Sequence, residues 1–428
     1  MIKIRSSTRR FAQNVMSLTG LQIALYIIPW LILPYLLRVL GPDAWGRVAV
    51  AQLTIGWLST LTMWGFPWTV TRKVAAQIDN QAALSKTLTN SWAAQILLAS
   101  AAVITLLIIC HIIPFLSEDK ELYLYGCGLV MAGVLFPTCY FNGVERMFEV
   151  AVVQLLCRAV GVIPLFIFVK APEDAPIVIA IAAYSTALVS IAAVFFNRKN
   201  IPLKFQLLSF AFVFRELREG ASMFFSTGWL ALQSSLITMV LGQVAGAASV
   251  GNYSLADRVR TGAQSIVGPI FQASFPRMAS LWSFSENNAQ SFLLRLLIVS
   301  LGITLTIGLV CGFFADRIVL ILGGDAYQAS AHLLRWMAPI IVLSALTNFF
   351  SLQIMVANGR IRAFNLILFW VGLGCVVSVY PMIYWLGAEG AVVLLLLLES
   401  ALAGSTLVYV LRSNLLTRRF NQLGKNNL

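Results

Sequence analysis

The chain has 428 residues, of which 59% are hydrophobic and only 11% are charged. Soluble domains carry about a quarter charged residues, so this composition excludes an ordinary soluble protein and predicts an integral membrane protein. The formal net charge of +13 is scattered over short loops, and it therefore does not indicate a nucleic acid partner. The six cysteines and two histidines show no metal-ligand or disulfide spacing, so we expect neither a metal nor a cofactor.

Apolar runs long enough to cross a bilayer recur along the whole chain. About 20 residues of helix span the roughly 30 Å of hydrocarbon, and helices satisfy the backbone polar groups there. The sequence therefore predicts an all-α integral membrane protein with twelve transmembrane helices. We place these at 15–37, 48–70, 88–113, 122–141, 149–168, 177–196, 221–241, 253–281, 292–314, 329–357, 364–386 and 391–411.

The N-terminal segment 1–13 is basic, with Lys3, Arg5, Arg9 and Arg10. The apolar run behind it is too long for the core of a signal peptide and should remain as the first span. When the loops are assigned alternately to the two sides, most lysines and arginines fall on the side of the N-terminus. Basic loops stay in the cytoplasm, so both termini are predicted to be cytoplasmic.

Two short motifs occur twice in the same order, which indicates an internal duplication. The stretches Asn142–Phe148 and Asn358–Phe364 both read N-G-x-x-R-x-F. In the second pair, Val39-Leu40-Gly41 recurs as Val240-Leu241-Gly242, and Gly46 with Ala51-Gln52 recurs as Gly251 with Ala256-Asp257. With six spans in each half, an even number, the two copies are predicted to form a parallel repeat.

The one substantial polar stretch, 197–220, joins the two halves. Its Leu203, Leu207, Phe210, Phe214 and Leu217 fall on one face of a helix, while its charged residues face elsewhere. We predict a helix that lies in the cytoplasmic interface and connects two domains. These are an N-terminal six-helix bundle, 1–196, and a C-terminal six-helix bundle with a cytoplasmic tail, 221–428.

Arg158 is the charge placed deepest in a predicted span of the first half. It lies about two turns into the fifth span, one turn after Gln154. A charge in mid-membrane costs at least about 2.5–3.5 kcal/mol, so we expect Arg158 to be buried beside a partner. A structural ion pair with Glu145 or Glu149 would meet that need, and so would a bound anion.

The span after Gly251 carries the most marked polar face. Asn252 can cap its helix, and the residues that follow on one face are Asp257, Thr261, Gln264, Gly268 and Gln272, with Arg258 and Arg260 beside them. Such a face either packs against other helices or lines a water-filled cavity, and the two arginines with the aspartate favour the cavity. Gly268-Pro269 should bend this helix and act as a hinge, because proline removes a backbone hydrogen bond.

Other spans carry weaker polar signals. Asn14, Gln52 and Gln233 lie on polar faces of the first, second and seventh spans. Glu399 is the only carboxylate near the centre of a span, where it is either a satisfied packing contact or, with Asp257, part of an ion-coupling site. The chain contains no G-x-x-x-x-G-K-[ST] phosphate loop and no long exterior loop with acid or base residues, so we do not expect an enzyme.

Four stretches together resemble a known family. They are Arg38–Gly46 (RVLGPDAWG), Tyr140–Met147 (YFNGVERM), Gly251–Arg258 (GNYSLADR), and Pro269 with Phe275-Pro276-Arg277. In this order they are similar to the motifs of the bacterial O-antigen and capsule flippases, the polysaccharide branch of the multidrug/oligosaccharidyl-lipid/polysaccharide (MOP) exporter superfamily. The chain departs from the family in carrying arginine instead of the more usual lysine at Arg146 and Arg258, which keeps the charge.

The resemblance implies two six-helix bundles that form a V around a central cavity and work by alternating access. The implied cargo is an oligosaccharide repeat unit on undecaprenyl diphosphate, moved from the cytoplasmic to the periplasmic leaflet of the inner membrane. Membrane lipids, a polysaccharide polymerase and a chain-length regulator would be its partners. Such a cargo needs cations and amides in the cavity, and the candidates are Arg158, Arg258, Arg260, Gln154, Gln52, Gln233, Gln264 and Asn14.

Two other readings stay open. A drug or organic-cation antiporter of the same superfamily would want a cavity lined by carboxylates, whereas this sequence has few acids and several arginines in its spans. A membrane enzyme of glycan assembly would want a catalytic site in a long exterior loop, which the predicted topology does not offer.

Overall fold

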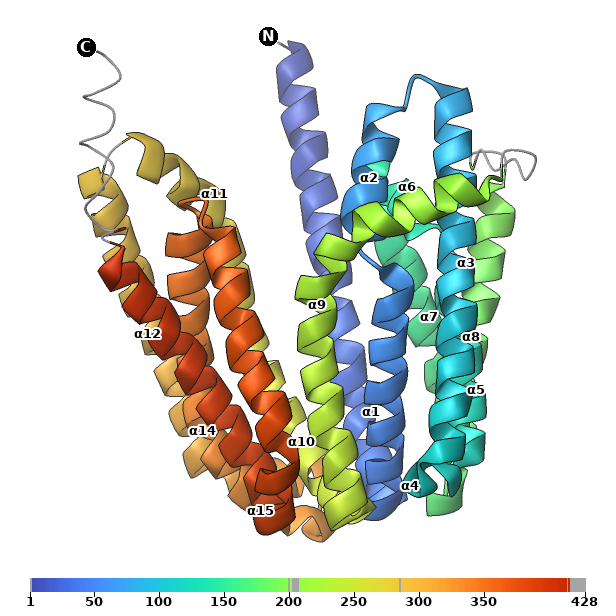
Figure 1. Cartoon of the computed structure of the whole chain (residues 1–428), viewed down its shortest axis with the longest axis vertical. Helices are drawn as coiled ribbons and strands as arrows, with labels where there is room; N and C mark the ends of the chain where they lie inside the picture. Colours follow the sequence, from blue (N-terminus) through green and yellow to red (C-terminus); the bar gives the residue numbers. More distant parts are fainter. Residues whose placement is uncertain (1, 199–200, 202–207, 285, 414, 416–428) are drawn as a thin grey trace. The chain divides into compact units, whose positions relative to one another are not determined.

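The computed structural model describes residues 2–198, 201, 208–284, 286–413 and 415, and every regular element in those ranges is helical (Figure 1). The chain divides into two compact units, Met1–Met239 and Val240–Leu428. The elements of the first unit are α1 (Ile2–Met63), α2 (Phe66–Ala76), α3 (Gln81–Ile112), α4 (Pro114–Ser117), α5 (Lys120–Gly133), α6 (Thr138–Gly143), α7 (Met147–Phe168), the 3-10 turn η1 (Pro172–Asp174), α8 (Ala175–Asn197) and α9 (Phe210–Ala245), which crosses the boundary.

The helix α1 consists of two arms that meet at Gly41. This glycine has φ 70° and ψ 175°, a conformation that is essentially restricted to glycine, and Pro42 follows it. The predicted spans 15–37 and 48–70 fall on the two arms. A second interruption, at Trp64 (φ 44°) and Gly65 (φ 98°), separates α1 from α2, so the predicted second span also contains a break.

The start of α9 is held against the first unit by polar contacts. The indole Nε1 of Trp64 donates to the Leu217 carbonyl over 2.6 Å, and Lys73 Nζ lies 2.6 Å from Glu216 Oε1. The side chain of Glu216 is fully buried, whereas Phe210 and Phe214 are exposed. Figure 1 shows this part of α9 running across the end of the unit beside α2 and α6 before it turns.

These contacts bear on the predicted connector. Leu203, Lys204 and Leu207 lie outside the described residues, and residues 210–220 are the first turns of α9 rather than a separate helix. The compact units divide inside α9, at Met239 and Val240, because its first turns contact α2 and α3. The predicted domain boundaries and the interfacial position of the connector stay predictions.

The second unit is built around α14. Its elements are α10 (Ala247–Ser265), α11 (Gly268–Phe284), α12 (Glu286–Phe313), α13 (Ala315–Gly323), the 3-10 turn η3 (Asp325–Tyr327), α14 (Gln328–Asn348), the π-helix η4 (Phe349–Val356) and α15 (Ile361–Arg412). The helix α14 packs against α10, α12 and α15, and α15 is itself two arms that meet at Gly387 (φ 57°).

Eight helical stretches of the described chain are long and apolar enough to cross a membrane. Two of them, Ile27–Ala76 and Ile361–Arg412, hold 50 and 52 residues, which at about 1.5 Å per residue is enough for two crossings each. The apolar part of α9, Ala231–Ala245, is shorter, and α10 with α11 form a broken, more polar pair. The predicted all-α membrane fold is confirmed, although the twelve predicted spans do not match these stretches one to one.

The duplicated motifs mark turns of similar geometry, but in a shifted register. Gly246 (φ 81°, ψ 167°) repeats the backbone of Gly41, so Gly246 and not Gly242 is its counterpart. This register keeps Gly46 with Gly251 and Gln52 with Asp257. The pairing with Gly242 was wrong because a match of residue types in apolar sequence does not show which glycine has the positive φ.

The two N-G-x-x-R-x-F stretches are also shifted in register, by two residues and in the opposite direction. Glu145 (φ 60°) and Gly359 (φ 73°) hold equivalent turns, and each precedes an arginine. The backbone N–H of Arg146 donates to the Phe141 carbonyl and that of Arg360 to the Met355 carbonyl, both over 2.8 Å. Arg146 is therefore the structural counterpart of Arg360.

Candidate functional site

The helix α10 has an apolar side that fixes it in the second unit and a polar side. Val250, Leu255 and Val259 are buried, and α10 packs against α14. Asn252 does not cap the helix as expected, because α10 begins five residues earlier, after Gly246. Instead Asn252 lies inside the helix, and its Oδ1 accepts a 2.9 Å hydrogen bond from Ser330 of α14.

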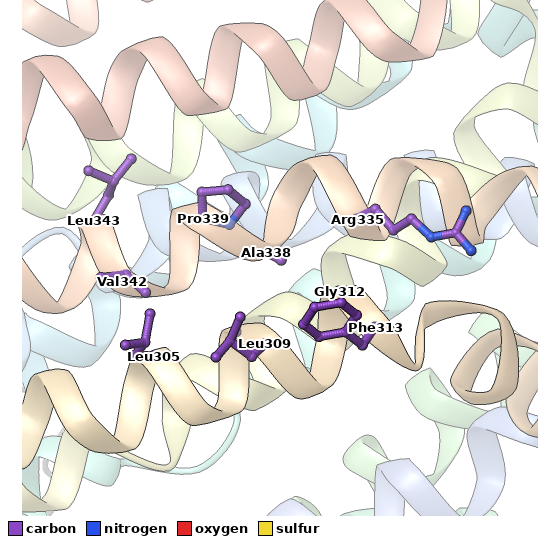
Figure 2. Close-up of a pocket in the computed structure, with 10 residues that line it drawn as sticks. Leu305, Leu309, Gly312, Phe313, Arg335, Ala338, Pro339, Val342 and Leu343 are labelled. Atoms are coloured by element: carbon purple, nitrogen blue, oxygen red, sulfur yellow. The ribbon is translucent and has the colours of Figure 1, made fainter.

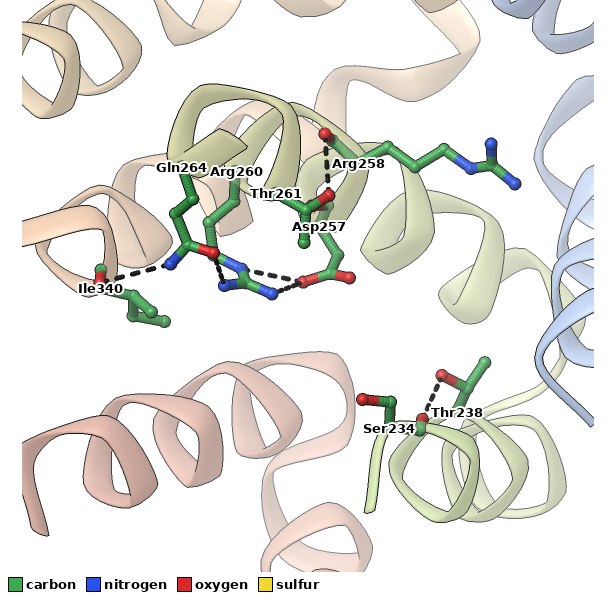
Figure 3. Close-up of polar contacts among 8 residues, drawn as sticks. All are labelled: Ser234, Thr238, Asp257, Arg258, Arg260, Thr261, Gln264 and Ile340. Atoms are coloured by element: carbon green, nitrogen blue, oxygen red, sulfur yellow. Dashed lines mark hydrogen bonds and ion pairs between the residues drawn. The ribbon is translucent and has the colours of Figure 1, made fainter. Parts of the chain in front are cut away.

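Asp257, Arg260 and Gln264 form one hydrogen-bonded chain along α10 (Figure 3). Arg260 donates to Asp257 Oδ1 from Nε over 2.8 Å and from Nη2 over 2.5 Å. Its Nη1 donates to Gln264 Oε1 over 2.8 Å, and Gln264 Nε2 lies 3.5 Å from the Ile340 carbonyl of α14. Arg260 is only 8% exposed, so this chain of contacts is a built, internal arrangement.

The ion pair with Asp257 changes the role that Arg260 can have. Its charge is compensated by Asp257, so it is not the unpaired cation that the sequence suggested for anion binding. Both hydrogen bonds from the guanidinium end on Oδ1, and the side chain of Asp257 is 30% exposed. The second carboxylate oxygen, Oδ2, is not engaged by Arg260.

Glu399 of α15 belongs to the same neighbourhood. Thr347 of α14 donates to Glu399 Oε2 over 3.4 Å, and the charges of Glu399 and Arg260 interact. The structure thus brings Asp257 and Glu399, the two acids considered for ion coupling, around one arginine. Among the described residues no group of three or more His, Cys, Asp or Glu could hold a metal ion.

Beyond Gln264 the helix breaks, and a cavity with both apolar and polar lining lies at the break. The helix α10 ends at Ser265 and α11 begins at Gly268, with Pro269 next, which is where the sequence predicted a bend. The cavity has a volume of about 150 Å³. Its polar lining consists of uncharged side chains from α10, α11, α12 and α14: Gln264, Gln272, Thr304, Ser344 and Asn348.

A buried amide that sequence reasoning missed ties α11 to the π-helix η4. Gln353 is fully buried. Its side-chain Nε2 donates to the Phe271 carbonyl over 2.8 Å, and its backbone carbonyl accepts from Trp282 Nε1 over 3.2 Å. Its Oε1 has no hydrogen-bond partner within the described part of the chain. The only sequence signal was a single glutamine in an apolar run, and nothing in that run indicates a π-helix.

The first-half candidates are placed differently from what we expected. Arg158 is exposed, as is Gln154 one turn earlier, so neither is packed inside its unit, and their place in a cavity stays a prediction. The helix α7 turns this face away from the core of its unit, a choice that apolar flanking sequence does not specify. Glu149, a proposed partner, pairs with Arg146, whose Nε donates to it over 2.6 Å.

The remaining candidates are only partly grouped. Gln52 is half-buried in α1, and Gln233 is buried in α9 with its Nε2 unbonded among the described residues. Figure 3 shows Arg258 pointing away from Asp257, Arg260 and Gln264. The side chain of Asn14 lies outside the described part. Within one unit, therefore, the structure assembles Asp257, Arg260, Gln264, Glu399 and the Gly268-Pro269 break.

The helical, multi-pass membrane fold of this chain is shared with solved structures of membrane transporters. An inward-facing multidrug resistance MATE family transporter of the MOP superfamily superposes with a TM-score of 0.71, covering 94% of this chain and 96% of that one at 15% identity. The chain belongs to the polysaccharide biosynthesis protein family, whose model matches residues 11–282.

Two relatives match almost end to end. A protein of Escherichia coli (strain K12) named "Putative O-antigen transporter" is 27% identical over 408 residues, which cover 94% of this chain and 97% of the relative. A protein of the same name from Shigella dysenteriae is 26% identical over 400 residues, covering 90% and 96%. These relatives are named transporters rather than enzymes, in agreement with the expectation that this chain is not an enzyme.

Proposed function

We propose that this protein is a flippase that moves undecaprenyl-diphosphate-linked oligosaccharide repeat units from the cytoplasmic to the periplasmic leaflet, for O-antigen or a related surface polysaccharide. The observation that carries the proposal is the group of uncharged polar side chains in the cavity at the α10–α11 break. Amides and hydroxyls from four helices converge there, and a glycan is recognised by such groups. The family and the near full-length match to O-antigen transporters support the same cargo.

The helix break beside this cavity would let the protein alternate between its two access states. Because Gly268 and Pro269 stand where the regular hydrogen bonding of the helix gives way to turn-like bonds, α11 can change its angle to α10 more easily than within a continuous helix. The hydrogen bond from Gln353 to the Phe271 carbonyl would hold the start of α11 against η4 and so limit the range of that change. Arg158 and Arg258 remain our candidates for the diphosphate, with Arg260 contributing only if its pair with Asp257 opens.

The proposal is tested in proteoliposomes that hold the full chain and a fluorescent undecaprenyl-diphosphate oligosaccharide. Transfer to the outer leaflet is followed by the access of a soluble glycosidase. Gln272→Leu and Asn348→Leu, which remove polar groups from the cavity, should slow transfer at least about tenfold, since each leaves sugar hydroxyls unpaired. Gln290→Leu, an exposed glutamine of α12 outside the cavity, is the matched control. Equal transfer by all three variants would contradict the proposal.

An organic-cation antiporter is the competing function, and Asp257 with Glu399 is the observation that favours it. A cation carrier would need one of these carboxylates unpaired, whereas Arg260 already compensates Asp257. The same proteoliposomes loaded with ethidium separate the two functions. We expect no ethidium transport under an imposed proton or sodium gradient, and transport that is lost in Asp257→Asn would support the antiporter.

The proposed setting is the bacterial inner membrane with both termini in the cytoplasm. Cysteines introduced at Glu118 and Glu173, both exposed, should react with an impermeant maleimide added outside intact spheroplasts. A cysteine at Lys199 should react only after lysis. Labelling of Lys199→Cys from outside would overturn this topology.

A further inference from the structure

The helices α12 and α14 leave an apolar groove of about 840 Å³ on the outside of the second unit (Figure 2). Its apolar lining comes from both helices, mainly Leu305, Leu309 and Phe313 of α12 and Ala338, Pro339 and Val342 of α14. Leu305, Leu309 and Phe313 are 50% exposed or more. In a membrane protein this surface meets lipid rather than water, so only an apolar chain can fill the groove.

Small residues create the groove. A Cβ added to Gly308 would lie 3.3 Å from the Ala338 carbonyl oxygen, and one added to Gly312 would lie 3.6 Å from the Ala338 Cβ. The two backbones therefore approach closely along this line, and the space beside the glycines stays open. Pro339 has no N–H to donate to the Arg335 carbonyl one turn earlier, which leaves a polar backbone group near the charged end.

One end of the groove carries a cation. Arg335 lines the groove, its side chain is 46% exposed, and its Nη2 pairs with Asp316 of α13. Figure 2 shows Arg335 beside Phe313, at the opposite end from Leu305 and Leu343. Trp336, 53% exposed, is next in sequence, and tryptophan is typical of the membrane–water interface. The groove thus runs from the interface about 12 Å into the hydrocarbon, over two turns of helix.

We propose that this groove binds one membrane phospholipid with an anionic head group, with an acyl chain along α12 and α14 and the phosphate on Arg335. An apolar slot that ends at an interfacial guanidinium matches a chain that ends in a phosphate. Arginine offers a planar fork of donors suited to phosphate, and the bond to Asp316 engages it through Nη2. With a single arginine partly compensated by Asp316, the end suits one phosphodiester charge better than a diphosphate.

The site is tested on the purified full chain by native mass spectrometry, with phosphatidylglycerol and phosphatidylcholine of identical acyl chains. We expect retained phosphatidylglycerol in the wild type and a loss of up to about fivefold in Arg335→Gln, the upper end of the effect of one half-exposed charge pair. Leu309→Trp, which fills the groove, should lower the retention of both lipids. The matched controls are Arg295→Gln and Leu294→Trp, which change exposed residues of α12 outside the groove.

A variant of opposite sign separates a lipid site from a purely structural ion pair. Asp316→Asn frees Arg335 and should increase phosphatidylglycerol retention, whereas an ion pair that only stabilises α13 would make Asp316→Asn and Arg335→Gln behave alike. Retention in Arg335→Gln equal to that in Arg295→Gln would overturn the proposal. Displacement of phosphatidylglycerol by equimolar undecaprenyl phosphate would also overturn it, because the groove would then bind a polyprenyl chain. A dimer whose interface protects Leu309→Cys from labelling would overturn it as well.

Discussion

The second arm of α1 with α2, and α10 with α11, are two copies of one backbone design. Each begins at a glycine with positive φ, Gly41 or Gly246. The first breaks after about six turns, at Trp64–Gly65, and the second after about five, at Ile266–Val267; each resumes with a proline in second position, Pro67 or Pro269. This turn and break belong to the fold, since both units have them.

The two copies differ in what their polar side chains contact. In the first, Thr54, Thr60 and Thr62 each donate to a carbonyl of their own helix, over 2.8, 3.0 and 2.7 Å. In the second, the position equivalent to Gln52 is Asp257, and it pairs with Arg260. The charged chain is thus an addition to one copy of a shared backbone, which is what a function specific to the second unit requires.

Separating that ion pair should have the largest effect. Arg260→Gln leaves Asp257 without its cation in a mostly buried position, and breaking a buried pair costs about 3–5 kcal/mol. We expect a clearly lowered melting temperature in detergent, measured by intrinsic fluorescence. Gln52→Leu, at the position of the first unit equivalent to Asp257, should cost far less. An unchanged melting temperature in Arg260→Gln would show that the pair does not stabilise α10.

The two glycines should respond alike if they are true counterparts. A Cβ on Gly41 or Gly246 would meet no atom within 4 Å, so alanine at either site costs only backbone strain. That strain is about 1–3 kcal/mol. Gly242 lies inside α9 and has no positive φ, so Gly242→Ala does not carry this strain. The melting temperatures of the three variants test the register, and a larger loss in Gly242→Ala than in Gly246→Ala would contradict it.

The contacts across the helix breaks should differ in strength between the units. Gln353 donates to the Phe271 carbonyl over 2.8 Å, whereas Thr71 of α2 donates to the Cys139 carbonyl of α6 over a longer distance, 3.4 Å. Gln353→Leu should destabilise the protein by about 1 kcal/mol and Thr71→Val by less, in line with the usual net value of a hydrogen bond. Hydrogen exchange at α11 and α2 measures both. Faster exchange at α2 in Thr71→Val than at α11 in Gln353→Leu would reverse this order.

The smallest effect is expected where α7 joins α8, a joint that in the second unit is made by Gly387 alone. The backbone N–H groups of Lys170 and Ala171 donate to Asp174 Oδ2 and lower the pKa of this carboxyl below its usual value. A lowered folded-state pKa means that the stabilisation is present above the ordinary pKa, near 3.8, and is lost as the pH falls through the folded-state value. Asp174→Asn should therefore lower the melting temperature slightly at pH 7, and by progressively less as the pH falls below 3.8.

Much of the fold could be predicted from apolar runs, because a bilayer forces them into helices. The predicted span 88–113 falls on α3, and the proline at Pro269 marks a real break. The site was harder. Asp257 and Arg260 were found from helical periodicity, but their mutual pairing, the exposure of Arg158 and the π-helix at Gln353 depend on rotamers and tertiary packing. Sequence spacing alone does not determine these.

The most direct test of the account is the double variant Asp257→Asn/Arg260→Gln in the proteoliposome assay. Removing both charges of the Asp257–Arg260 pair leaves Glu399 as the one acid of this group that has lost its interaction with Arg260, so the double variant should recover part of the melting temperature lost in Arg260→Gln. The account predicts that this folded double variant nevertheless transfers the lipid-linked oligosaccharide at less than about a tenth of the wild-type rate, because the charged chain serves transport rather than the fold. Transfer at the wild-type rate by the stable double variant would contradict it.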